Sequence, residues 1–320
     1  MSAIQRPGVI DTITAGFGTV NKRLWLIVIP ILLDLMLWFG PKVSIAPLVN
    51  QALDGYHRLL IESSTQASSS DQLTSEQIEG VYLQTKEVVE PISRLNLVGI
   101  LAWQLPSLLK TAMPEGGVAM GIESGFVFVL FLLGLGIASS FGVCIYLGAI
   151  AQFVRGDRFD SRFFLRRIGI NWARLLLFFV LLLFPLGVFV LTAVFLLGVT
   201  GLWNAGVASI FGGLGLGMVL WLMLYLFFVK SAIFVDDVNT FWAIWHSFNL
   251  VRSNLWSALG LFLLINVVSL GMGIALGLIV GHPLGTLVAI IGNAYVLTGL
   301  AAATMIYYRD RRVLSQPREV

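Results

Sequence analysis

The chain has 320 residues, and 58% of them are hydrophobic while only 12% are charged. Soluble domains carry about 25% charged residues, so this composition excludes an ordinary soluble enzyme or binding domain. The formal net charge is +3, and no folded basic module accompanies the arginines, so we expect no nucleic-acid partner.

Long uncharged runs predict helices that cross a lipid bilayer. A spanning helix needs about 20 apolar residues, and the runs 124–154, 175–229 and 253–308 contain no charged residue. The sequence therefore predicts an all-α polytopic membrane bundle of six transmembrane helices in three hairpins, with amphipathic helices at the cytoplasmic interface. The predicted spans are 24–39, 125–151, 172–198, 207–229, 255–280 and 284–308.

An amphipathic interfacial helix is expected over 8–23, directly before the first span. Its apolar residues recur at i, i+3, i+7 and i+10, which places them on one helix face. They are Ile10, Ile13, Phe17 and Val20. Asp11 lies near the start, where the helix dipole favours an acid. We expect this helix to lie along the inner membrane surface and to turn into the span at Trp25, an interfacial anchor.

A long polar segment, 43–123, follows the first span and is expected outside the cytoplasm. Part of it, 71–89, has a weak helical pattern. Residues 97–109 are apolar, but thirteen residues are too few to span comfortably, and Pro106 interrupts a helix there. We interpret this piece as interfacial or re-entrant because a crossing would place the basic segment 155–171 on the outer face. The sequence leaves open whether it crosses.

Basic residues gather in the segment 155–171, before the span that begins at the second anchor, Trp172. The arginines of this segment are candidate contacts for anionic lipid headgroups. They are Arg158, Arg162, Arg166 and Arg167. Ordinary positive-inside anchoring explains them equally well. Most of the twenty Lys and Arg residues fall on this side of the predicted bundle, so both termini, including the tail 309–320, are expected in the cytoplasm.

One segment of the sequence occurs twice, 231 positions apart. Residues 16–25 and 247–256 share the pattern small-Phe-x-x-Val-polar-x-x-Leu-Trp. The match predicts a second interfacial helix over 237–253, which leads into the fifth span at Trp256. Its stripe corresponds to the first one, with Phe241, Ile244, Phe248 and Val251. Duplication explains the match, and convergence of helices that lead into membrane spans is the alternative. Residues 155–172 resemble a degraded third copy.

Few polar residues occur inside the predicted spans. Asp34 is the only acid there; it is either a site for an ion, proton or substrate, or a carboxylate bonded to Asn293 or to the outer segment. Asn266 and Asn293 are expected to form hydrogen bonds between helices. The only cysteine, Cys144, excludes an internal disulfide and is interpreted as a packing residue. The three histidines are far apart in the sequence, so no metal or cofactor is expected.

One stretch resembles a known family. It runs from Phe228-Val229-Lys230 to Val235-Asp236-Asp237, followed by Ser247-Phe248-x-Leu250-Val251-Arg252-x-Asn254-x-Trp256. It is similar to the membrane domain attached to some glycerophosphoryl diester phosphodiesterases and to its stand-alone prokaryotic relatives, over roughly 125–308. The resemblance implies a helical bundle in a prokaryotic cytoplasmic membrane. The catalytic domain of the fused members is absent, so no catalytic residue is carried over.

Three functional hypotheses remain open at this stage. The first is a non-enzymatic accessory or lipid-interacting bundle, with membrane lipids as its partners and a homo-oligomer left open. The second is a transporter or channel component built from parallel repeats. The third is an intramembrane enzyme acting on lipids, although no catalytic motif nominates its residues.

Overall fold

The computed structural model describes residues 7–66, 75–93, 96–99, 107, 119–156, 159–201 and 205–315. The chain divides into two compact units. Unit 1 consists of Met1–Ile31 and Ser140–Val320, and unit 2 of Leu32–Ser139.

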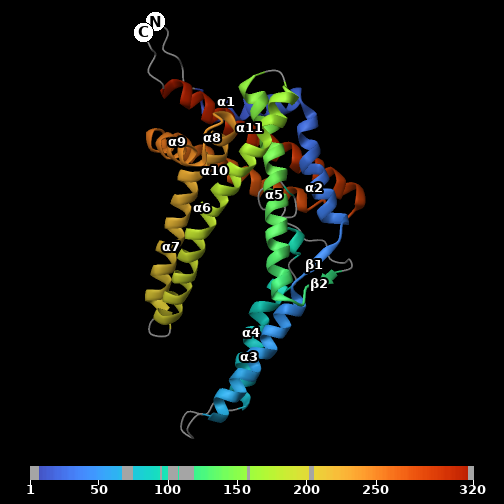
Figure 1. The fold of residues 1–320 in the computed structure, drawn as a ribbon, viewed down its shortest axis with the longest axis vertical. Coiled ribbons are helices and arrows are strands. Elements are labelled where there is room, and N and C mark those ends of the chain that lie inside the picture. Colours follow the sequence, from blue (N-terminus) through green and yellow to red (C-terminus); the bar gives the residue numbers. More distant parts are fainter. Residues whose placement is uncertain are drawn as a thin grey trace. The chain divides into compact units, whose positions relative to one another are not determined.

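The described residues are mostly helical (Figure 1). The elements in chain order are α1 (Val9–Lys22), η1 (Leu24–Ile27), α2 (Val28–Phe39), β1 (Lys42–Ser44), α3 (Ala46–Gln66), α4 (Ser75–Ser93), β2 (Ala119–Gly121), α5 (Gly125–Arg155), α6 (Ser161–Gly201), α7 (Ala205–Leu226), α8 (Val229–Val235), α9 (Thr240–Ser253), α10 (Leu255–Gly277) and α11 (Pro283–Ser315). Two three-residue strands are the exception, so the all-α class is confirmed.

Five helices in the described part of the chain are long and apolar enough to cross a membrane. They are Gly125–Arg155, Ser161–Phe189, Gly212–Val235, Leu255–Gly277 and Pro283–Arg312. The first predicted span, 24–39, is apolar but shorter than these five, and it begins with the 3₁₀ turn η1. The chain is thus a multi-pass membrane protein in composition, and a sixth span stays a prediction.

Two of the predicted boundaries differ most from the structure. Helix α6 runs without a break from Ser161 past Trp172, so most of the basic segment 155–171 belongs to the same helix as the apolar residues after it. Asp160 stabilises its start, because its carboxylate accepts a hydrogen bond from the main-chain N–H of Phe163 at 3.0 Å. Helix α11 likewise continues to Ser315, into the predicted tail 309–320, whose last five residues lie outside the described range.

The two similar sequence segments fold into two similar helices, α1 and α9. Each has 14 residues, and their first and last residues are 231 positions apart. The preceding residues, Gly8 and Asn239, are both extended, with φ −66°, ψ 168° and φ −70°, ψ 164°. The residues that end the helices, Arg23 and Asn254, share a second conformation, with φ −146°, ψ 62° and φ −134°, ψ 38°. In both copies a new helix starts at the next residue, a leucine.

The buried face of these helices overlaps the predicted apolar stripe only at Val20 and Val251. Three buried positions coincide in the two copies: Thr12, Gly16 and Val20 in α1 correspond to Ala243, Ser247 and Val251 in α9, which also buries Thr240 and Leu250. The first residue of each stripe points outward instead, since Ile10 is 74% and Phe241 64% exposed. Small side chains let a helix approach its neighbour closely, and large apolar ones lose nothing by facing lipid.

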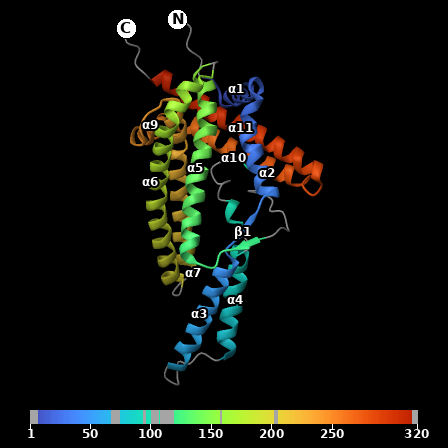
Figure 2. The same cartoon turned by 45° about the vertical axis from the view of Figure 1, so that its right-hand side comes forward.

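Helix α1 packs against α11 at a close crossing in unit 1. A Cβ atom on Gly16 would lie 2.5 Å from the carbonyl oxygen of Gly299, and one on Gly299 would lie 2.6 Å from the Phe17 ring. The Phe17 ring is also 5.5 Å from that of Tyr295, whose hydroxyl donates a hydrogen bond to Asn21 Oδ1 at 2.7 Å. The two glycines therefore set the distance between the helices. Helices α6 and α7 lie side by side elsewhere in unit 1 (Figure 2).

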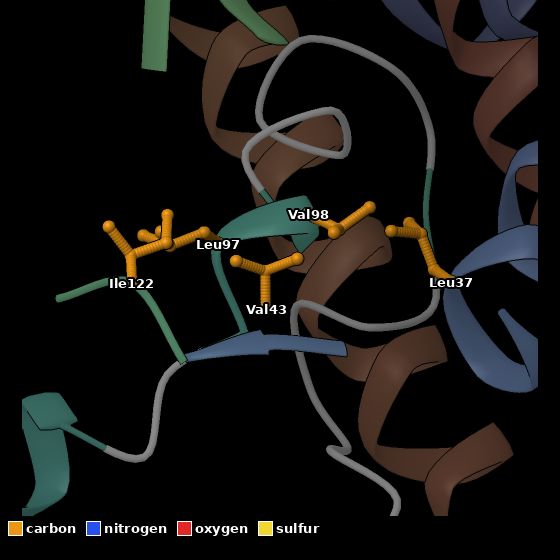
Figure 3. Close-up of a cluster of buried hydrophobic side chains, with 5 residues drawn as sticks. All are labelled: Leu37, Val43, Leu97, Val98 and Ile122. Carbon is orange, nitrogen blue, oxygen red and sulfur yellow. The ribbon is translucent and has the colours of Figure 1, made fainter. Parts of the chain in front are cut away.

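Unit 2 contains the polar segment 43–123. Helices α3 and α4 lie side by side, and α4 corresponds to the predicted 71–89 helix displaced by four residues. Strands β1 and β2 pair in parallel, with Val43 opposite Met120. Val43 of β1 belongs to a cluster of buried apolar side chains, whose other members are Leu37, Leu97, Val98 and Ile122 (Figure 3). The start of the ambiguous piece 97–109 thus packs into a small core, and its other residues except Gly99 and Ser107 lie outside the described range.

Candidate functional site

A buried helix in unit 1 leads into two consecutive acids. All residues of α8 are buried except Lys230, which is half-buried. Asp237 has φ 55°, a left-handed conformation that Asp and Asn tolerate better than most residues. Asn239 then caps α9, because its side chain accepts a hydrogen bond from the Trp242 main-chain N–H at 3.0 Å. We call Asp236 and Asp237 the acidic turn.

Asp237 lies between two arginines of α6. Arg174 Nη1 donates to Asp237 Oδ1 at 2.6 Å and to the Asp237 main-chain carbonyl at 2.9 Å. Arg167 Nη1 pairs with the other carboxylate oxygen, Oδ2. The Asp237 side chain is only 12% exposed, so an unpaired carboxylate here would carry a large desolvation cost. The two arginines therefore hold α6 against the acidic turn.

Asp236 joins α9 and α11 to the same turn. Tyr308 donates its hydroxyl hydrogen to Asp236 Oδ2 at 2.7 Å, and Arg312 Nε pairs with the same oxygen. His246 Nδ1 is 3.8 Å from that oxygen, beyond hydrogen-bonding distance. Both acids are thus paired with arginine, an arrangement that stabilises a fold.

Two more arginines bind main-chain carbonyls close to this cluster. Arg155 Nη2 donates to the carbonyl of Phe234 in the last turn of α8, and Arg309 Nη1 donates to that of Val154 in the last turn of α5. The last carbonyls of a helix have no partner in the helix itself and carry partial negative charge, so a guanidinium is favourable there. The acidic turn and these contacts link α5, α6, α8, α9 and α11.

We expect His246 to make the stability of the chain depend on pH. Burial of the ring, and then the charge of Arg312, lower the pKa of His246 below its usual 6.5, while Asp236 opposes this shift. As the pH falls below about 6.5, His246 becomes protonated in the unfolded chain before it does in the folded chain. The free energy of unfolding is therefore highest above that pH and declines below it. The midpoint of thermal unfolding should therefore fall between about pH 7.5 and about pH 5.5.

His246→Gln should flatten that dependence. His282→Gln is the matched control, because His282 is exposed, and it should leave the pH dependence unchanged. An equal slope in the wild type and in His246→Gln would contradict the assignment.

The cavity beside the cluster is small. It has a volume of about 20 Å³ and is lined by residues of α5, α6 and α8, including Cys144, Gln152 and Asn171. Such a space holds about one water molecule. Among the described residues, no group of three or more His, Cys, Asp or Glu side chains is placed to hold a metal ion.

No family model, curated protein or solved structure matches this chain. The resemblance of residues 125–308 to a phosphodiesterase membrane domain therefore stays a prediction. The geometry of the described residues is the basis for assigning a role.

The polar residues predicted within the spans have different surroundings. Asp34 is fully buried in unit 2, where Ser107 donates its hydroxyl hydrogen to Asp34 Oδ1. This contact favours the alternative in which the outer segment satisfies the carboxylate. Asn266 is exposed and donates its side-chain hydrogen to the Phe262 carbonyl of its own helix at 2.7 Å, not to another helix as expected. Asn293 is buried in unit 1, and its Nδ2 has no hydrogen-bond partner among the described residues.

The three predicted tryptophan anchors have different surroundings. Trp25 is 44% exposed, and its ring meets those of Phe153 and Phe159 edge to face. Trp256, its counterpart, is 82% exposed. Trp172 is held within unit 1, where its Nε1 donates to Ser140 Oγ at 3.0 Å. The first two retain the exposure that an interfacial anchor requires, and the third is a packing residue of α6.

The predicted lipid-contact arginines separate into two kinds. Arg162 and Arg166 are exposed, and neither forms a hydrogen bond or an ion pair with the described residues. Arg167 instead pairs with Asp237, and Arg158 lies outside the described range.

Sequence reasoning missed Arg174, Tyr308 and the structural role of the acidic turn. The available signal was a pair of acids directly after an apolar run, in a chain with few acids near its spans.

Proposed function

We propose that the chain is a non-enzymatic multi-pass protein of a prokaryotic cytoplasmic membrane that binds anionic lipids at its inner face. The observation that carries this proposal is the sorting of arginines along the first turns of α6. Arg167 and Arg174 face the acidic turn, whereas Arg162 and Arg166 are exposed one helical turn apart. Residues four apart lie on the same helix face, so these two charges are neighbours on the surface.

Exposed apolar side chains surround this basic surface. Leu165 is 68% and Ile170 50% exposed, and Phe163 is 39% exposed. A helix end that combines arginines with exposed apolar residues is typical of a membrane–water interface, where anionic lipid adds to the binding energy. The orientation with this end in the cytoplasm follows the positive-inside rule.

We also propose that α1–η1 and α9–α10 descend from one duplicated unit. The shared helix length, the two shared cap conformations and the shared buried positions support duplication over convergence, because convergence at a membrane surface requires only an amphipathic pattern. We further propose that residues 125–308 are related to the membrane domain of glycerophosphoryl diester phosphodiesterases. The residues that carry this resemblance form α8, the acidic turn and α9, which together act as a structural hub.

The double variant Arg162→Glu/Arg166→Glu should reduce the enrichment of anionic lipid around the protein. Each charge near a membrane surface contributes about 1 kcal/mol, so the reversal should lower the enrichment by at least about tenfold. The measurement is the lipid composition of nanodiscs or detergent micelles that contain the purified protein, relative to the bulk membrane.

The matched control is Arg58→Glu/Lys86→Glu, which makes the same charge change on exposed residues of α3 and α4. It should leave the enrichment as in the wild type. No enrichment in the wild type, or an equal loss in both double variants, would refute the proposal.

A further inference from the structure

A groove lies between α9 and the last turns of α11. Its volume is about 310 Å³, and it is lined by Trp242, Trp245 and Asn249 of α9 and by Tyr308, Arg311 and Arg312 of α11, among other residues. All of these belong to unit 1. The groove is about fifteen times larger than the cavity beside the acidic turn, so it has room for a chemical group of several heavy atoms.

Two guanidinium groups make one wall of the groove positive. Arg312 is held by Asp236. Arg311 lies over the Tyr307 ring, 5.2 Å from its centroid, and its Nη2 donates to the Pro7 carbonyl at 3.2 Å and to Ser257 Oγ at 3.4 Å. These long bonds use only one nitrogen among the described contacts, so the remaining donors of Arg311 are available to an anion. A fixed guanidinium with spare N–H groups suits a phosphate oxygen.

Aromatic rings form the opposite wall. Trp242 and Trp245 line the groove and are 56% and 55% exposed, and the neighbouring Phe241 is 64% exposed. Trp rings are enriched at the headgroup level of a bilayer, where one side is apolar and the other wet. An occupant of this groove would therefore meet positive charge at one wall and an apolar aromatic surface at the other.

Helix α1 provides an internal comparison, because its backbone matches that of α9. The α1 residues 231 positions before Trp242, Trp245 and Asn249 are Asp11, Thr14 and Gly18. They offer no aromatic ring, and the first is an acid that would repel an anion. The features that form the groove are thus specific to α9 and are not a requirement of the repeated helix itself.

We propose that this groove binds the headgroup of an anionic glycerophospholipid, with the phosphate on Arg311 and the acyl chains along Trp242 and Trp245. The inference rests on the proposed membrane function, but it uses residues other than the α6 surface. It assigns a discrete site for one lipid, in addition to the general attraction of the arginines on α6.

The test is native mass spectrometry of the full-length protein titrated with phosphatidylglycerol. The removal of one charge should weaken binding, so Arg311→Gln should retain the lipid about fivefold less well. Asn249→Trp, which fills the groove without changing the charge, should also reduce retention. Arg252→Gln is the matched control, since it removes an arginine from an exposed position of α9 that does not line the groove, and it should bind as the wild type does.

Two results would overturn the site. Equal losses in Arg311→Gln and Arg252→Gln would mean that only general surface charge acts. Equally tight binding of inorganic phosphate would mean that acyl chains play no part and that the groove takes a soluble anion. Arg162→Glu/Arg166→Glu should lower bulk enrichment and leave the discrete lipid bound. If that variant changes nothing while Arg311→Gln loses the lipid, the α6 surface fails and the groove stands.

Discussion

Gly16→Leu should destabilise the protein by about 3 kcal/mol, the upper part of the range for overpacking a tight contact. The Cβ atom alone would lie 2.5 Å from the Gly299 carbonyl oxygen and 2.7 Å from the Ala303 main-chain nitrogen. Neither partner is a flexible side chain, so α1 and α11 would have to separate along their crossing. The separation would also expose the buried face of α1, including Thr12 and Val20.

The loss of stability can be measured through the reactivity of Cys144. Cys144 is buried, at 1% exposure, so a thiol-reactive fluorescent dye labels it only as the fold opens on heating. Gly18→Leu is the control, because a Cβ atom at that position, two residues away, would have nothing within 4 Å, and leucine favours a helix over glycine by almost 1 kcal/mol. Gly16→Leu should therefore unfold at a clearly lower temperature than both the wild type and Gly18→Leu. Equal unfolding temperatures would show that the crossing is not tight.

Helices α1 and α9 also show how much of the structure the repeated sequence pattern predicts. The 231-residue offset predicted two related interfacial helices, and α1 and α9 have matching ends. Of the residues in the apolar pattern, only Val20 and Val251 are buried in the protein, because a search for apolar periodicity finds large side chains. At a membrane surface those side chains can face lipid, while small residues such as Gly16 and Ser247 face the protein. Apolar periodicity alone cannot tell a lipid-facing stripe from a protein-facing one.

The arginines of α6 show a second feature of the structure that the sequence could not predict. Arg162, Arg166 and Arg167 are equivalent in a count of basic residues, yet only Arg167 meets an acid, Asp237, seventy positions later in the chain. Which of these arginines meets an acid depends on where the acidic turn lies beside α6. The position of the turn depends in turn on the burial of α8. The long apolar helices, by contrast, were predictable from length and composition alone, because an apolar run can form a membrane helix whatever its neighbours are.

Asp237→Asn should destabilise the fold by about 2 kcal/mol. Removal of one partner from a buried ion pair costs about 3–5 kcal/mol, and the value here is reduced because Arg167 is 40% exposed and therefore partly solvated. Asparagine tolerates the left-handed conformation of residue 237 and can still accept a hydrogen bond, so the substitution tests the charge and not the turn. The loss is read from the same Cys144 labelling on heating.

Asp310→Asn is the matched control, since Asp310 is 26% exposed and pairs with the partly exposed Arg309 at 2.9 Å, and it should cost less than about 1 kcal/mol. The double variant Asp237→Asn/Arg174→Gln completes a cycle. If the carboxylate serves to neutralise α6, the double variant should lose less stability than the sum of the two single variants, because no unpaired Arg174 remains. Strict additivity would mean that Asp237 and Arg174 act independently. The link between α6 and the acidic turn would then rest on Arg167 and on apolar packing.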